Sequence, residues 1–371
     1  MENLVASQFP SQAQCNPYLY LLKSSLAECG VESHEHKLFV DGLGVPPPVL
    51  DEDWLFRHRG RVNVLHFHWL QKFYRADSIE ESKQKIDKIE SFFALAHKLN
   101  YRIAYTFHNI VPHEGMGKEL DFKVRRILIE NADVIYCFSR RQQARLQEIF
   151  GPIPLTVIPH SNYIGYYPDE LSSEECRQRL ELPADTKVFS YIGLIRPYKE
   201  LCNLLATFSA LKAQDICLLL AGASRDAKST QVIEELAQRD KRVRCHLRWI
   251  DDDEVQLFMK AADAIVLPYL RCWSSGALLL AFSFGKPVVT ADPMMLDHTD
   301  GLGFFYQDGG LKEALETAVK ADDLEEMGGR CLEFARAHSW SEAARQLAAS
   351  YRSACEIAVP AVRPVAAGVR I

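Results

Sequence analysis

Short apolar runs alternate along the chain with longer stretches in which apolar residues recur at helical spacing. In the first half, strands are expected at residues 4–7, 34–40, 62–67, 101–107, 134–138 and 155–158. Helices are expected between them, at residues 17–29, 78–99, 118–131 and 140–150. Residues 41–53, which include three consecutive prolines, are expected to form an irregular loop. This alternation favours a parallel sheet with helices on both faces.

The same alternation returns after residues 151–185, a segment with several prolines, glycines and tyrosines that we expect to link two domains. Strands are predicted at residues 187–192, 216–221, 243–248, 263–267 and 286–290. Residues 321–338 and 340–357 are predicted to be the terminal helices. The sequence therefore predicts an α/β protein of two Rossmann-like domains, residues 1–160 and 161–338.

The composition narrows the classes of function. The chain has 371 residues, of which 48% are hydrophobic and 25% charged, as expected of a globular protein with room for two domains. A net charge of −6 argues against nucleic acid as the main partner, because a polyanion binder normally has a basic excess. The ten cysteines are scattered without paired spacing, which is typical of reduced thiols in a cytosolic protein. We expect no signal peptide, since the first residues lack a basic region, and no membrane-spanning helix, since the sequence lacks a long apolar run.

Residues 187–205, KVFSYIGLIRPYKELCNLL, place cations at the end of a predicted strand. A helix is expected to begin near Pro197, because proline needs no amide partner at the first helical position. Arg196 and Lys199 would then lie beside free backbone amides and the positive end of a helix dipole, which favours an anion. For this motif alone, an Arg and a Lys on an ordinary solvated loop remain the alternative.

A second anion-binding feature follows at residues 264–289, AIVLPYLRCWSSGALLLAFSFGKPVV. Its Ser-Ser-Gly sequence opens an apolar helix that Ser274 or Ser275 can cap. Gly276 lets a ligand approach the backbone amides. Two helix N-termini at one crevice, one of them with cations, would suit a diphosphate.

Together these segments resemble the C-terminal domain of GT-B glycosyltransferases, most closely the retaining family 4 type and its exopolysaccharide branch. The family's G-x-I-x-x-x-K-G-x-x-x-L-L motif is matched at Gly193, Arg196, Lys199, Leu204 and Leu205. Glu200 stands where the family has glycine, and G-x-P-V-V is matched at residues 285–289. The resemblance implies a deep interdomain cleft and a last helix, residues 339–357, that packs back on the N-terminal domain. Residues 358–371 are expected to form a flexible tail.

The resemblance also implies the roles of residues. Arg196 and Lys199 are expected to hold the donor diphosphate and, with His108, to be catalytic, since a departing diphosphate gains negative charge that fixed cations stabilise. The strand ends at Gly222 and at Trp249 and Ile250 are expected near the base. The implied donor-binding set is Gly193, Arg196, Lys199, Gly222, Trp249, Ile250, Tyr269, Ser274, Ser275, Gly276 and Ala277. Tyr269 has two equal alternatives: it lines the base or sugar pocket, or it forms a rigid exit from the strand.

His108 directly follows the predicted strand 101–107, at the carboxyl end where ligands bind in doubly wound sheets. It matches the family's T-x-H-N/D position, so we expect it to hydrogen-bond the donor sugar or the acceptor; a structural role is the alternative. The loop with Asn109, His113 and Glu114 is expected to face the acceptor.

The sequence predicts no bound metal and no cofactor beyond the nucleotide-sugar co-substrate. His66 and His68 alternate along a predicted strand, which we interpret as placing them on opposite faces. The same interpretation excludes His34 and His36 as a pair of metal ligands, and no third ligand stands at a metal-binding spacing.

One departure concerns the family's E-x7-E signature, whose glutamates lie near the transferred sugar and the ribose. Aligned on residues 285–289, these positions are Cys272 and Leu280, neither of which accepts hydrogen bonds as a carboxylate does. The Ser-Ser-Gly residues are candidate replacements, and a catalytically silent protein becomes an alternative.

The resemblance thus implies a cytoplasmic glycosyltransferase that moves a sugar, with a UDP-sugar favoured, to a glycan or lipid-linked oligosaccharide in polysaccharide biosynthesis. The alternatives are a silent nucleotide-sugar-binding subunit and a sugar-nucleotide epimerase. Five basic residues leave peripheral contact with the inner face of a membrane open, although a solvated surface is the simpler interpretation: Lys123, Arg125, Arg126, Arg140 and Arg141. The sequence does not determine the oligomeric state.

Overall fold

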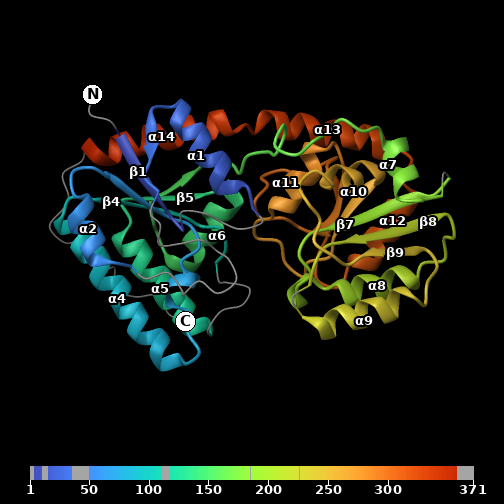
Figure 1. Ribbon diagram of the computed structural model, residues 1–371, viewed down its shortest axis with the longest axis horizontal. Helices are drawn as coiled ribbons and strands as arrows, with labels where there is room; N and C mark the ends of the chain where they lie inside the picture. Colours follow the sequence, from blue (N-terminus) through green and yellow to red (C-terminus); the bar gives the residue numbers. More distant parts are fainter. Residues whose placement is uncertain are drawn as a thin grey trace. The chain divides into compact units, whose positions relative to one another are not determined.

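The computed structural model describes residues 4–10, 16–35, 50–110, 117–183, 185–224 and 226–356. The chain forms two compact units. Unit 1 contains the residues up to Pro159 and those from Trp340 onward, and unit 2 contains His160–Ser339. Both are α/β units with a parallel sheet (Figure 1), as predicted. The predicted tail lies outside the described residues.

The sheet of unit 1 has six strands within the described residues, in the order β2-β1-β3-β4-β5-β6. The elements in chain order are β1 (Leu4–Phe9), α1 (Tyr18–Glu28), β2 (Val31–Ser33), α2 (Glu52–His58), β3 (Val64–Phe67), α3 (Gln71–Tyr74), α4 (Ile79–Lys98), β4 (Arg102–Thr106), α5 (Lys118–Asn131), β5 (Val134–Cys137), α6 (Arg140–Phe150), β6 (Leu155–Val157) and α14 (Trp340–Glu356).

Helix α14 belongs to unit 1 because its apolar face packs against α1. Its buried residues include Trp340, Leu347 and Tyr351, which recur at helical spacing and join one core with Leu22 of α1. In Figure 1, α1 and α14 lie on one side of the sheet and α2, α4 and α5 on the other. Both faces of the sheet are therefore covered, as a parallel sheet requires.

The sheet of unit 2 also has six strands within the described residues, in the order β12-β11-β10-β7-β8-β9. The elements in chain order are α7 (Ser173–Arg179), β7 (Lys187–Ile192), the 3₁₀ turn η1 (Pro197–Lys199), α8 (Leu201–Ser209), β8 (Ile216–Ala221), α9 (Ala227–Ala237), β9 (Val243–His246), α10 (Val255–Ala261), β10 (Ala264–Leu267), α11 (Gly276–Ser283), β11 (Val288–Ala291), β12 (Gly303–Tyr306), α12 (Leu311–Lys320) and α13 (Leu324–Ala337).

Strand β8 of unit 2 is apolar along its whole length. Strand β8, ICLLLA, is buried at every position because helices cover both of its faces. Helices α8 and α9 pack together on one side of the sheet, and α10 and α11 lie on the other (Figure 1).

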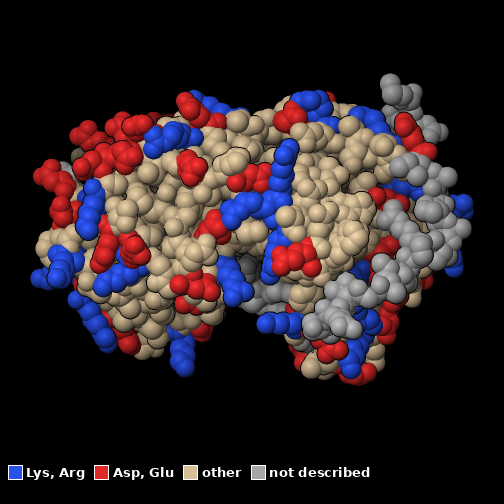
Figure 2. Space-filling view, turned by 180° about the vertical axis from the view of Figure 1, so that it is seen from behind, with Lys and Arg blue, Asp and Glu red and all other residues tan. Residues whose placement is uncertain are grey.

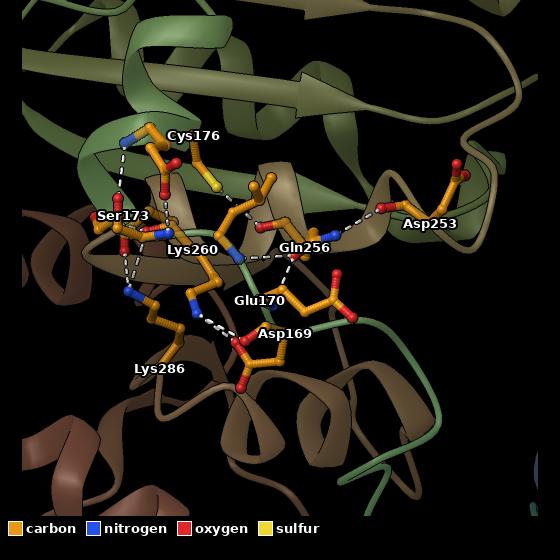
Figure 3. A network of polar contacts seen from close by, with 12 residues as sticks. Asp169, Glu170, Ser173, Cys176, Asp253, Gln256, Lys260 and Lys286 are labelled. Carbon is orange, nitrogen blue, oxygen red and sulfur yellow. Dashed lines mark hydrogen bonds and ion pairs between the residues drawn. The ribbon is translucent and has the colours of Figure 1, made fainter.

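A polar network fastens the segment before α7 to α10 (Figure 3). The side-chain oxygen of Gln256 accepts hydrogen bonds from the amides of Glu170 and Leu171, at 3.1 and 3.2 Å. Lys260 forms an ion pair with Asp169. These contacts anchor the segment near the start of unit 2.

Several predicted elements differ from the observed ones. The strand predicted at residues 34–40 is wrong at His34 and Glu35, which follow β2, and residues 36–40 lie outside the described residues. The predicted loop at 41–53 overlaps α2, whose N-cap Asp51 accepts a hydrogen bond from the Asp53 amide at 2.9 Å. The pattern also misses β12 and α12, because β12 is a four-residue strand that begins with glycine and is only partly buried.

Candidate functional site

The sheet of unit 2 reverses its direction of winding between β7 and β10. The chain runs outward from β7 to β8 and β9, and then crosses back to β10, β11 and β12 on the other side. In doubly wound sheets, ligands bind beyond the carboxyl ends of the strands at such a reversal. The loops that follow β7 and β10 carry the Arg196–Lys199 and Ser-Ser-Gly features, so the fold brings both features to this edge.

The ends of β7 and β8 each require a glycine. Gly193 has a φ of +139° and Gly222, at the end of β8, a φ of +147°, values that other residues rarely adopt. A Cβ on Gly222 would lie 2.0 Å from the carbonyl oxygen of Gly193. The two strand ends therefore approach each other backbone to backbone, which fixes the start of the loop that carries Arg196 and Lys199.

The prediction that a helix begins near Pro197 is wrong in its geometry. Pro197–Lys199 is a single 3₁₀ turn, Glu200 follows in the left-handed conformation with a φ of 55°, and α8 begins at Leu201. The fixed φ of proline suits the tight turn as well as an α-helix. A glycine would adopt the conformation of Glu200 without strain, which explains why the resembling family has glycine there.

Lys199 lies between two tyrosine rings. Its Nζ is 5.7 Å from the ring centroid of Tyr191 and 6.0 Å from that of Tyr269. The side chain is half-buried, and among the described residues neither a carboxylate nor a hydrogen-bond acceptor pairs with the ammonium. Burial, together with the charge of Arg196, lowers the pKa of Lys199 to about 8. A desolvated ammonium without an internal counter-ion favours the binding of an anion.

Ser275 caps helix α11, as one of the two predicted alternatives. Its hydroxyl accepts a hydrogen bond from the Leu278 amide at 3.3 Å, while Ser274 precedes the cap. Gly276 and Ala277 form the first turn of α11, where backbone amides lack intrahelical partners. A Cβ on Gly276 would lie 2.7 Å from the Tyr163 hydroxyl, so this glycine leaves room for Tyr163.

The two positions aligned with the family's glutamates are apolar in the structure. Cys272 is 3% exposed and packs in the core of unit 2. Burial, assisted by the charge of Asp292, raises the pKa of the Cys272 thiol to about 12, so the thiol is neutral at physiological pH. Leu280 is half-buried on α11. Neither side chain supplies the carboxylate that the resemblance would place there.

The end of β9 carries the other predicted donor residues. Trp249 is 48% exposed and Ile250 is half-buried. Arg248 donates to both carboxylate oxygens of Glu254 at 2.6 Å and is thus held within unit 2. The Gly222 amide donates to the His246 carbonyl at 3.0 Å, which joins this strand end to that of β8. Trp249 offers a partly exposed aromatic surface at this edge of the sheet.

His108 lies at the carboxyl edge of the sheet in unit 1 and is only 5% exposed. Its Nε2 lies 3.1 Å from Nδ1 of His68, and Nε2 of His68 lies 2.8 Å from the side-chain oxygen of Gln8. The Trp69 ring packs on His108 with centroids 4.3 Å apart. One nitrogen of His108 is therefore engaged with His68, and the ring orientation is fixed by its neighbours.

The prediction that His66 and His68 point to opposite faces is wrong. Residues two apart on a strand share a face, and the two ring centroids lie 4.1 Å apart. His66 contacts the Thr106 hydroxyl at 2.8 Å and the Tyr351 hydroxyl at 2.5 Å. Burial lowers the pKa of His66 to about 3, so the ring is neutral. Across the described ranges, no group of three or more His, Cys, Asp or Glu residues could hold a metal ion.

The basic residues of α5 do not form a uniform basic surface. Arg125 is 2% exposed, and Lys123 forms an ion pair with Asp87 at 3.2 Å. On the face in Figure 2, Lys and Arg are interspersed with Asp and Glu. In the part of the chain that the structure describes, no helix has the length and apolar character needed to cross a bilayer. His113 and Glu114 lie outside the described residues, whereas Asn109 is half-buried.

Sequence reasoning missed Tyr191, Tyr163 and His68. Tyr191 lies within β7 and Tyr163 in the segment leading into unit 2, and neither belongs to a motif. For His68 a signal was available, because a residue two positions from His66 on one strand must share its face. The pairing of the tyrosines with Lys199 and Gly276 depends on tertiary contacts that spacing does not reveal.

The two doubly wound parallel sheets define a GT-B-like architecture, as the resemblance implied. Sucrose-phosphate synthase from Thermosynechococcus elongatus has a TM-score of 0.72 at 18% identity, covering 95% of this chain and 99% of that one. Anabaena HepE in complex with UDP and glucose has a TM-score of 0.69 at 15% identity, covering 95% of this chain and 100% of that one. At these identities the similarity shows the fold alone.

Sequence comparison finds similarity within the site-bearing unit. Residues 186–321 match the model of the family described as Glycosyl transferases group 1. The GDP-mannose:glycolipid 4-beta-D-mannosyltransferase of Xanthomonas campestris pv. campestris is 26% identical over 231 residues, which cover 62% of this chain and 61% of that enzyme. The match thus leaves more than a third of that enzyme's length uncovered.

Proposed function

We propose that this chain is a glycosyltransferase that transfers a sugar from a nucleoside diphosphate donor to a glycan or glycolipid acceptor. The proposal rests on one observation: the ammonium of Lys199 is half-buried and has no carboxylate partner among the described residues. It lies beside Arg196 at the winding reversal of unit 2. A diphosphate supplies the negative charge that this position lacks.

The chemistry that these residues would perform is charge stabilisation. As the bond between sugar and diphosphate breaks, negative charge grows on the departing phosphate oxygens. Arg196, Lys199 and the first amides of α11 would stabilise that charge. Bound phosphate would also raise the pKa of Lys199 from about 8, which keeps the ammonium protonated.

The proposed donor carries a nucleotide base at the end of β9, near Trp249. A UDP-sugar is the donor that we favour, in line with the UDP complex of HepE, whereas the mannosyltransferase relative is named for GDP-mannose. Retention of anomeric configuration is part of the proposal by resemblance, as are a cytoplasmic location and action in polysaccharide biosynthesis.

A thermal-melting screen of the full chain tests the proposal. With a donor at about 100 times its Kd, binding to the folded state adds about 2.7 kcal/mol of stability, which raises the Tm. We expect UDP-sugars or GDP-sugars to raise it, and Arg196→Ala to lose most of the shift. If no nucleoside diphosphate or its sugar changes the Tm, the proposal fails.

A catalytically silent nucleotide-sugar-binding protein is the second candidate, and the core position of Cys272 favours it. Both candidates bind the donor, so turnover distinguishes them. Transfer to an acceptor, or slow donor hydrolysis that Arg196→Ala abolishes, supports the enzyme. Binding without any turnover in the presence of glycan and glycolipid acceptors supports the silent protein.

A further inference from the structure

Tyr269 connects the two halves of the candidate anion site. It lies two residues after the end of β10, and its backbone amide donates to the Leu267 carbonyl at 2.8 Å. Its ring centroid lies 6.0 Å from Nζ of Lys199, and its hydroxyl interacts with the side chain of Ser275, the N-cap of α11. A single side chain therefore lies beside both the cation after β7 and the helix start after β10.

The position of Tyr269 is itself fixed. Its carbonyl oxygen accepts a hydrogen bond from the Tyr306 hydroxyl at 3.0 Å, and Tyr306 is buried in β12. The second ring beside Lys199 is fixed through its own hydroxyl, because Tyr191 donates to the Leu194 carbonyl at 2.8 Å. Lys199 thus lies between two aromatic rings that backbone hydrogen bonds hold in place.

Lys199 needs such support because nothing else restrains its ammonium. The described residues offer it no ion pair and no hydrogen bond. A free lysine side chain has several rotatable bonds, and a ligand that captures it must overcome their entropy. Aromatic rings attract an ammonium through their electron-rich faces. The side chain is then already restrained before the ligand arrives, so ligand binding costs less conformational entropy.

We propose that Tyr269 is a positioning residue of the anion site, whose ring holds the Lys199 ammonium beside the start of α11. This inference rests on the proposed function, since the anion is the donor diphosphate. Tyr269 sets the separation between the cation and the helix amides, so one diphosphate meets both. The role differs from the expected lining of a base or sugar pocket, because the ring faces a protein cation.

Two substitutions separate the contribution of the Tyr269 ring from that of its hydroxyl. Tyr269→Leu removes both, and Tyr269→Phe keeps the ring and the fold while removing the hydroxyl near Ser275. Phe304→Leu is the matched control, because Phe304 packs against the same core from β12. Affinities for UDP, GDP and inorganic pyrophosphate are measured by calorimetry from pH 6.5 to 9.5.

The titration of Lys199 is measured separately, without a ligand, from the pH dependence of its acetylation by mass spectrometry. We expect Tyr269→Leu to weaken diphosphate binding about 5- to 30-fold. It should also move the Lys199 midpoint above about 8, because water then reaches the ammonium. Tyr269→Phe should weaken binding only about 2- to 5-fold and leave the midpoint unchanged.

The two readouts distinguish the failure of this inference from the failure of the proposed function. If the Lys199 midpoint and the affinities of Tyr269→Leu equal those of the wild type or of Phe304→Leu, the positioning role is overturned while diphosphate binding stands. If the wild type binds none of the three ligands, the proposed function is overturned, and the role of Tyr269 in donor binding falls with it.

Discussion

Replacing Lys199 by methionine should stabilise the protein while abolishing donor binding. Burial, with the charge of Arg196, lowers the pKa of Lys199 from its ordinary 10.5 to about 8. At about 1.4 kcal/mol per pKa unit, this shift corresponds to about 3 kcal/mol of destabilisation at neutral pH. Because the side chain retains some exposure and two rings attract the ammonium, we expect a net gain of about 1–2 kcal/mol for Lys199→Met.

The effect of Lys199→Met on stability should depend on pH. A lysine whose folded-state pKa is lowered destabilises the fold fully below that pKa, here about 8. The cost disappears as the pH rises through 8 towards the unfolded value of 10.5, because the folded protein then no longer holds the proton. The stability advantage of Lys199→Met should therefore shrink over this interval.

Urea unfolding at pH 7.0 and 9.5 measures both effects, with thermal shifts by UDP and GDP as the binding assay. Lys241→Met is the control, because Lys241 is exposed and should change stability by less than about 0.5 kcal/mol. Lys199→Arg retains the charge and should show no gain. A Lys199→Met protein that is less stable than the wild type at pH 7.0, or that still responds to diphosphates, would refute the reasoning.

Three further substitutions test the local structure. Glu200→Gly should raise stability by up to about 1 kcal/mol in urea unfolding, since glycine adopts the φ of 55° without strain; a loss of stability would contradict this. Gly222→Ala should cost about 1–3 kcal/mol or more, because the new Cβ meets the Gly193 carbonyl at 2.0 Å, and an unchanged Tm would contradict it. Gln256→Leu should lower stability by about 1–3 kcal/mol by orphaning two backbone amides, with Gln256→Glu as the milder control; equal stabilities would show that the network in Figure 3 contributes nothing.

The fold was largely predictable because each strand of the two parallel sheets is a short apolar run between amphipathic helices. β8 and α5 illustrate this, since their observed bounds equal the predicted ones. The predictions failed where tertiary context decides. Pro197 suits a 3₁₀ turn and an α-helix equally, and the left-handed Glu200 that separates them leaves no periodic signal.

The candidate site was predictable in part. The carboxyl-end rule places Arg196, Lys199 and Ser275 at one edge of the sheet as soon as the strand order is known. The sequence could not reveal that two tyrosine rings lie beside Lys199, because Tyr191 lies in β7 and Tyr269 follows β10, and their approach depends on the order of the strands. The error about His66 and His68 was one of interpretation, since the strand period of two already places them together.

The central claim is that a diphosphate binds between Lys199 and the start of α11. A crystal structure of the full chain with UDP or GDP tests it most directly. The account predicts a phosphate oxygen within about 3 Å of the Lys199 ammonium, with the other phosphate contacts made by Arg196 and the first amides of α11. A nucleotide bound elsewhere, with Lys199 left between its two tyrosine rings and without a phosphate, would contradict the account.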